Sequence, residues 1–138
     1  GYRGETAGAL YQLGFYTDEN NYIMYGSDLA AGTMAPKVAN GGTVTTGTPV
    51  AVTFGRAFWV TITVTETEIV FKINTGISIS SNNMGDGVYN LGNEETITTN
   101  IPVSSWLQPR NYVKTETTAA KQLSILDVQI IWCYGFLV

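Results

Sequence analysis

The sequence predicts an all-β fold of the two-sheet sandwich type, and three observations support this prediction. Apolar and hydroxyl side chains alternate along residues 59–65, and the alternation resumes along residues 69–74. Turn-forming Gly, Pro, Asn and Asp residues recur at intervals of roughly 8 to 12 residues, which is typical of β-sandwiches. No segment has the apolar period of a helix of ordinary length. At 138 residues, the chain is expected to form one domain, 1–138, around one core.

Residues 59–65 and 69–73 are predicted to form the central β-hairpin of this sandwich. Successive side chains of a strand point to opposite faces, so each run has one apolar face for the core. Trp59 falls on the other face and is expected to lie outside the core. Asn-Thr-Gly at 74–76 is expected to end the second strand. The residues expected inside are Val60, Ile62, Ile69 and Phe71.

A second hairpin is predicted over residues 10–28. Gly14 interrupts its first strand, where a bulge or a close backbone approach is expected. The Asp-Glu-Asn-Asn run at 18–21 is its turn. Residues 35–39 and 50–54 are short strand candidates among many glycines.

The second half of the chain contains the less regular segments. Residues 77–93 are rich in Gly and Asn and are expected to form a long loop. The predicted strands are 96–99, 111–116 and 121–132, with a Pro-bracketed turn and one turn of 3₁₀ helix at 103–107 between the first two. Residues 1–7 and 133–138 are expected to be arms.

The composition excludes several classes of function. The net charge is −4, from 7 basic and 11 acidic residues, and the basic residues are scattered, so no nucleic-acid or membrane-surface partner is expected. The chain has no His and a single Cys133, which excludes Ser-His-Asp and Cys-His catalysis and the usual structural zinc sites. Charged residues make up only 13% of the chain, so Thr, Ser, Asn and Gly must cover much of the surface, as is typical of secreted, adhesive or virion β-proteins.

Three segments together resemble a known family. They are GFYTDENNYIMY, GRAFWVTITVTETEIVFKINTG and TTNIPVSSWLQPRNYVKTETTAAKQLSILDVQIIW. In this order they are similar to the concanavalin A-like jelly-roll domains of tailed-phage virion proteins, over most of residues 13–132. The resemblance implies a two-sheet antiparallel jelly roll with the central hairpin and the C-terminal strand as neighbouring parts of its core. Such domains usually have one or two further strands before the first of these segments, and only about a dozen residues are present here to supply them.

Carboxylates are the only candidate catalytic groups. Laminarinase-like relatives of this fold use paired acids on one strand, and Glu66 and Glu68 have the required spacing. They fall at a predicted hairpin tip, where solvated acids are ordinary. Glu94 and Glu95 are adjacent and are expected to point to opposite faces. We therefore expect no enzymatic activity and no catalytic residue.

Two loops carry the hard oxygen ligands that Ca²⁺ prefers. One is the turn at 18–21, and the other is the long loop, which is the favoured candidate. Neither has the fixed pattern of a dedicated calcium loop, and the same residues are common in ordinary turns. No other cofactor is expected. The candidate ligands in the long loop are Asn82, Asn83, Asp86 and Asn90.

Glycan binding needs exposed aromatic rings beside polar side chains. Tyr22, Tyr89 and Trp106 are the favoured glycan contacts, with Tyr25 and Tyr112 as further candidates. The alternative is that these rings pack in the core, although Tyr89 lies in the long loop and is the least suited to it. Asp127 lies among apolar residues, where a structural role in accepting hydrogen bonds is expected.

The expected function is structural. The chain is expected to be a self-assembling decoration or fibre domain of a virion surface that contacts glycans, with a carbohydrate-binding module and a subunit of an extracellular filament as alternatives. Its expected partners are copies of itself or other structural subunits. A terminal arm is expected to complete the sheet of a neighbouring copy. For the C-terminal arm, the apolar assembly residues are Tyr134, Phe136 and Leu137.

Overall fold

The computed structural model describes residues 2–4, 9–28, 32–52, 57–77, 93–115 and 123–125. Within these residues the chain forms strands and turns and no helix, so the all-β prediction is confirmed. The strands are β1 (Tyr2–Gly4), β2 (Ala9–Asp18), β3 (Asn21–Asp28), β4 (Thr33–Asn40), β5 (Thr43–Thr46), β6 (Val50–Ala51), β7 (Ala57–Val64), β8 (Ile69–Ile77), β9 (Asn93–Ile97), β10 (Gln108–Thr115) and β11 (Leu123–Ile125).

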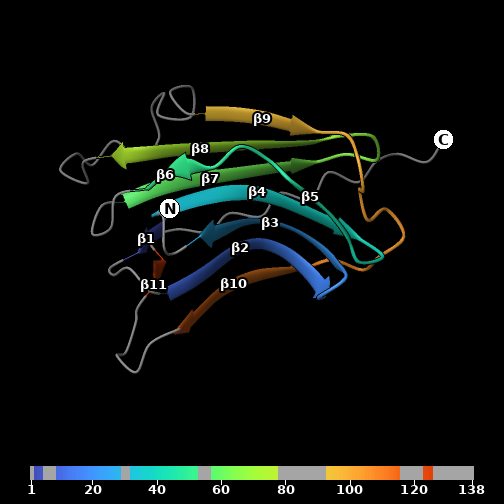
Figure 1. Cartoon of the computed structure of the whole chain (residues 1–138), viewed down its shortest axis with the longest axis horizontal. Coiled ribbons are helices and arrows are strands. Elements are labelled where there is room, and N and C mark those ends of the chain that lie inside the picture. The colour runs from blue at the N-terminus through green and yellow to red at the C-terminus, as the bar shows by residue number, and fades with distance from the viewer. Residues whose placement is uncertain are drawn as a thin grey trace.

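The strands form two antiparallel sheets, as the sequence predicts (Figure 1). The five-stranded sheet has the order β11-β1-β7-β8-β9. The six-stranded sheet has the order β10-β2-β3-β4-β5, and β6 also pairs with β4. The jelly-roll assignment of this architecture stays a prediction.

The core lies between the two sheets. Both contribute fully buried side chains to one cluster, and Tyr25 of β3 meets Phe71 of β8 across it with a ring-centroid distance of 5.3 Å and nearly perpendicular planes. Edge-to-face contact is a favoured geometry for an aromatic pair. The buried members of the cluster are Tyr11, Leu13, Ile23, Tyr25, Met34, Val38, Phe58, Ile69, Phe71, Ile73 and Ile97.

The central hairpin is confirmed with its predicted faces. Ile69 and Phe71 are fully buried, Val60 and Ile62 pack against the core, and Trp59 is outside the buried cluster. The predicted end of the second strand is wrong, because β8 continues to Ile77. Phe58 pairs with Thr75 and Ala57 pairs with Ile77, so Gly76 is the extra residue of a bulge rather than part of a terminating turn.

The β2–β3 hairpin is also confirmed. Gly14 has a φ of +155°, and a Cβ atom there would lie 2.3 Å from the carbonyl oxygen of Ile23, so the expected close backbone approach is present. The bulge lies at Thr17 instead, between the pairs Tyr16 with Tyr22 and Asp18 with Asn21.

The segment between the hairpins forms β4, β5 and β6. Residues 35–39 lie in β4, as predicted, whereas the 50–54 strand is reduced to Val50–Ala51 among the described residues. The carbonyl of Pro36 accepts a bond from Gly47 N–H, on the side of β4 away from β3. In an antiparallel strand the N–H and C=O of one residue point to the same side, so the N–H that proline lacks would also point away from β3. Pro36 therefore removes no hydrogen bond from the β3–β4 ladder.

β5 was missed in the sequence because it is short and polar. Thr45 is held by side chains from the segment after β9: its hydroxyl lies 3.1 Å from that of Thr99 and accepts a bond from the Asn100 amide. The 3₁₀ helix expected at 103–107 is wrong, since this segment contains a β-turn closed by a bond from Ser105 N–H to the Pro102 carbonyl. The predicted strands on either side are present as β9 and β10, with shifted bounds.

The interpretation of residues 1–7 as an arm is wrong for residues 2–4. These residues form β1, which pairs with β7 on one side and β11 on the other. β1 therefore supplies a strand before the β2–β3 hairpin, and it separates the central hairpin from β11. Residues 133–138 and most of the predicted strand 121–132, including Asp127, lie outside the described residues, as does the predicted loop between Ile77 and Asn93.

Candidate functional site

The outer face of the six-stranded sheet carries a row of aromatic and basic side chains. Phe15, Ile23 and Val113 pack against the core, so the residues next to them in β2, β3 and β10 point away from it. These outward residues are Tyr16, Tyr22, Arg110 and Tyr112, which we call the tyrosine–arginine platform.

The register of the three strands brings these four side chains together. Tyr16 pairs directly with Tyr22, and their rings are nearly parallel at a centroid distance of 6.4 Å. The guanidinium carbon of Arg110 lies 3.9 Å from the ring centroid of Tyr16 and 4.3 Å from that of Tyr112. Both distances are well within the range of a cation–π contact. Two rings from different strands thus hold one guanidinium group.

Two glycines lie near the platform on β2 and β3. Arg110 pairs with Gly14, so no side chain stands opposite it on β2. A Cβ atom at Gly26 would lie 3.2 Å from Lys37 Cδ, which shows that the Lys37 chain lies across this glycine. The platform therefore has a second cation at its margin.

The platform carries a cation, Arg110, although the protein as a whole is acidic. Within the part of the chain that the structure describes, no carboxylate forms an ion pair with Arg110 or Lys37. The ion pair present there joins Lys72 and Glu94 on the other sheet, at 2.7 Å.

Tyr22 acts as a neutral hydrogen-bonding group of the platform. Burial raises the pKa of Tyr22, and the neighbouring Tyr16 raises it further. A phenol with a raised pKa stays protonated at neutral pH and can donate as well as accept a hydrogen bond.

The predicted glycan contacts have different outcomes. Tyr22 is half-buried and belongs to the platform. Trp106 is 91% exposed in the segment before β10, so the alternative that it packs in the core is wrong. Its backbone carbonyl accepts a bond from the Thr17 hydroxyl, which fixes this segment beside the end of β2. Tyr25 is fully buried and is no platform residue.

Tyr16 and Arg110 were missed by the sequence reasoning. Tyr16 pairs with Tyr22 because of the bulge at Thr17, and the predicted turn at 18–21 alone would place Thr17 opposite Tyr22. Arg110 has only one sequence signal, its position two residues before Tyr112 and directly before the predicted strand 111–116. Its contact with Tyr16 depends on the β10–β2 register, which links distant parts of the chain.

The other predicted sites lie outside the described residues. This applies to Tyr89, to the calcium candidates Asn82, Asn83, Asp86 and Asn90, and to the assembly residues Tyr134, Phe136 and Leu137. In the alternative calcium loop, one Asp18 oxygen accepts bonds from the Asn20 N–H and the Asn21 amide, so it serves as a turn residue. No group of three or more His, Cys, Asp or Glu side chains suited to a metal ion occurs among the described residues.

The candidate catalytic acids lie as the sequence predicts. Glu66 and Glu68 are exposed at the β7–β8 turn, where the Thr65 hydroxyl accepts a bond from the Glu68 N–H. Glu94 pairs with Lys72 on the outer face, whereas Glu95 pairs with the inward-facing Phe71, so the two point to opposite faces. No helix in the described residues is long and apolar enough to span a membrane.

Comparisons with protein-family models, curated proteins and solved structures found no match to this chain.

Proposed function

We propose that this chain is a non-catalytic surface domain that binds acidic glycans through the tyrosine–arginine platform. The single observation that supports this most strongly is the Arg110 guanidinium between the rings of Tyr16 and Tyr112, without a carboxylate partner in the described chain.

The contact geometry suits an anionic ligand. The guanidinium carbon lies 3.9 Å and 4.3 Å from two ring centroids. The N–H donors of a guanidinium lie in its plane and match the two oxygens of a carboxylate or sulfate. The rings also limit the rotamers of Arg110, so less conformational entropy is lost when it binds.

The remaining groups suit a sugar. The phenol hydroxyls of the platform tyrosines can bond to sugar hydroxyls, while the ring carbons offer apolar surface to the C–H groups of a pyranose. Trp106, exposed in the segment leading into β10, is a further aromatic contact for a longer chain.

The test compares two charge-removing variants of the full chain. Arg110→Gln removes the platform cation, and Lys72→Gln removes one positive charge from the other sheet. Binding to alginate, hyaluronan and chondroitin sulfate is measured at low salt, with dextran as the neutral control. We expect at least one acidic polymer to bind, and Arg110→Gln to weaken it by about tenfold or more, because a charge-assisted bond is lost.

Lys72→Gln should change this affinity little. Equal weakening by both variants would show a non-specific charge effect, and failure of all three acidic polymers to bind would refute the proposal.

A structural role in a virion or an extracellular filament is the second candidate. It rests on the resemblance of residues 13–132 to phage jelly-roll domains and on the apolar tail 133–138. In this role the platform would contact host glycans while the tail joins copies of the chain. Deletion of residues 134–138 should then shift the protein to a smaller species on a sizing column, and an unchanged elution volume would exclude the tail from assembly.

A further inference from the structure

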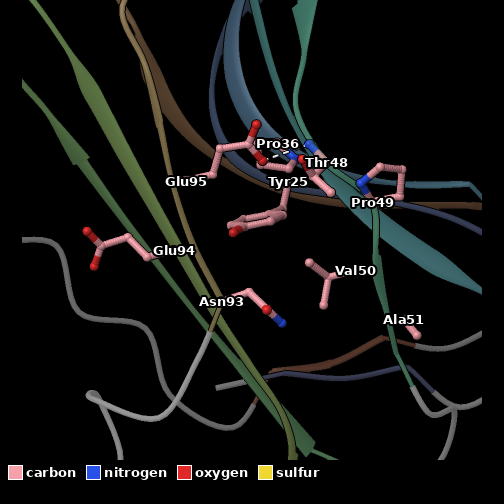
Figure 2. A pocket seen from close by; sticks show the side chains of 9 residues that line it. All are labelled: Tyr25, Pro36, Thr48, Pro49, Val50, Ala51, Asn93, Glu94 and Glu95. Carbon is pink, nitrogen blue, oxygen red and sulfur yellow. Dashed lines mark hydrogen bonds between the residues drawn. The ribbon is translucent and has the colours of Figure 1, made fainter.

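A cavity of about 470 Å³ opens at one edge of the molecule, between the two sheets. Figure 2 shows Glu94, Glu95 and Asn93 of β9 on one side and residues 48–51 on the other, with Tyr25 between them. We call this cavity the edge pocket. Its volume is in the range of pockets that hold small molecules.

The pocket exists because the ladder along β4 is interrupted. β5 pairs with residues 37–40 of β4, and β6 pairs with Thr33 and Met34, so Ala35 and Pro36 have no strand partner on that side. The chain between β5 and β6 bends away there, and Gly47 N–H reaches back to the Pro36 carbonyl. Tyr25 is the β3 partner of Pro36, so its side chain lies at the same level as this gap.

Glu95 is fixed at the rim of the pocket. Its Oε2 atom accepts a bond of 2.7 Å from the Thr48 N–H. A Cβ atom at Gly47 would lie 2.6 Å from the same carboxylate oxygen, so only glycine permits this close approach. One carboxylate oxygen is thereby bound to the 48–51 wall, and Oε1 keeps its capacity to accept a further bond.

The hydroxyl of Tyr25 has no such partner among the residues that the structure describes. Tyr25 is 1% exposed, and within the described part of the chain its hydroxyl makes no hydrogen bond. Its ring is held edge-on against Phe71, and Figure 2 shows the hydroxyl directed toward β9. Burial raises the pKa of Tyr25, and the charge of Glu95 raises it further, so the group remains a donor. A buried hydroxyl that lacks a partner is costly, which marks it as a ligand contact.

The two groups together select the chemistry of the ligand. Glu95 Oε1 requires a donor, and the Tyr25 O–H requires an acceptor. An ammonium group only donates, and a carboxylate only accepts and is repelled by Glu95. A hydroxyl group does both, and Pro49 and Val50 supply an apolar wall for the carbon skeleton.

We propose that the edge pocket binds one small neutral polyhydroxy molecule, such as a hexose or a polyol. This site is separate from the platform in position and opposite in charge, and it does not depend on acidic-glycan binding there.

The test uses the full chain and a defined set of probes. Glucose, galactose, mannose, myo-inositol and glycerol are titrated by ligand-observed NMR, with glucuronate as the acidic match for glucose. At least one neutral probe should bind, and glucuronate should bind more weakly than glucose because of Glu95. Tyr25→Phe should weaken the neutral probe by about tenfold, since one hydrogen bond is lost. Arg110→Gln should leave it unchanged.

A second measurement separates a ligand contact from a structural role. Without ligand, Tyr25→Phe keeps the ring and removes a hydroxyl that has no partner in the described residues, so its melting temperature should equal or exceed that of the wild type. A clearly lower melting temperature would show that the fold itself uses the hydroxyl and would overturn the proposal. Failure of every neutral probe to bind, or equal binding by wild type and Tyr25→Phe, would overturn it as well.

Discussion

The tyrosine–arginine platform and the edge pocket share one strand, β3, yet their chemistry is opposite. Tyr22 and Tyr25 are three residues apart on β3, so they point to different faces of the six-stranded sheet. Tyr22 joins Tyr16 on the face that carries Arg110 and Lys37. Tyr25 points between the sheets, where the charge of Glu95 raises its pKa.

The two tyrosines also differ in what their hydroxyls contribute to folding. Tyr22 is half-buried and keeps access to water, so its hydroxyl can bond to water and needs no partner within the fold. Tyr25 is fully buried and makes no hydrogen bond within the described residues. A buried hydroxyl that does not contribute to stability indicates a function more strongly than a hydroxyl that can form a hydrogen bond with water.

Of the substitutions that test this comparison, Phe71→Ala should have the largest effect on stability. The ring of Phe71 is fully buried and holds Tyr25 in place, so its loss should cost about 3 to 5 kcal/mol of unfolding free energy and disturb the pocket. Thr63→Ala, at an exposed position of the same hairpin, should cost less than about 1 kcal/mol. Denaturant titration measures both, and equal losses would contradict the inward and outward faces assigned here.

Gly14→Ala tests whether the platform depends on the close approach of β2 and β3. A Cβ atom at Gly14 would overlap the Ile23 carbonyl, and the φ of +155° disfavours alanine, so we expect a loss of more than about 1 kcal/mol. β2 and β3 must separate to relieve this contact, which should also weaken acidic-glycan binding. Gly41→Ala is the matched control, because its φ is also positive at +56° but the space around it is open. A greater loss for Gly41 than for Gly14 would show that backbone strain, rather than the close approach, decides the cost.

The sequence predicted those parts of the fold whose signal is local. The period of two in the central hairpin assigned its buried face correctly, because one face of each of its strands is apolar, and the turn residues at 18–21 located the hairpin of residues 10–28. β1 and β5 were missed because they are short and polar, and each is held by distant segments, β1 by β7 and β11, and Thr45 by Asn100.

The candidate sites were predicted less well for the same reason. Tyr22 was found from its type and its place in a hairpin. Arg110 and Glu95 were not, because their roles depend on contacts with Tyr16 and Thr48, and each contact requires the register or approach of segments that are far apart in the sequence.

The smallest expected effect comes from two neighbouring acids. Glu94→Gln breaks an ion pair whose side chains are 42% and 54% exposed, so it should change stability by less than about 1 kcal/mol. Glu95→Gln keeps an acceptor for the Thr48 N–H but removes its charge, and we expect a loss of about 1 kcal/mol. The clearer difference should appear in binding: Glu95→Gln should remove the preference of the edge pocket for glucose over glucuronate, whereas Glu94→Gln should preserve it. If only Glu94→Gln removed the preference, Glu94 rather than Glu95 would give the pocket its acidic character, and the assignment made here would be wrong.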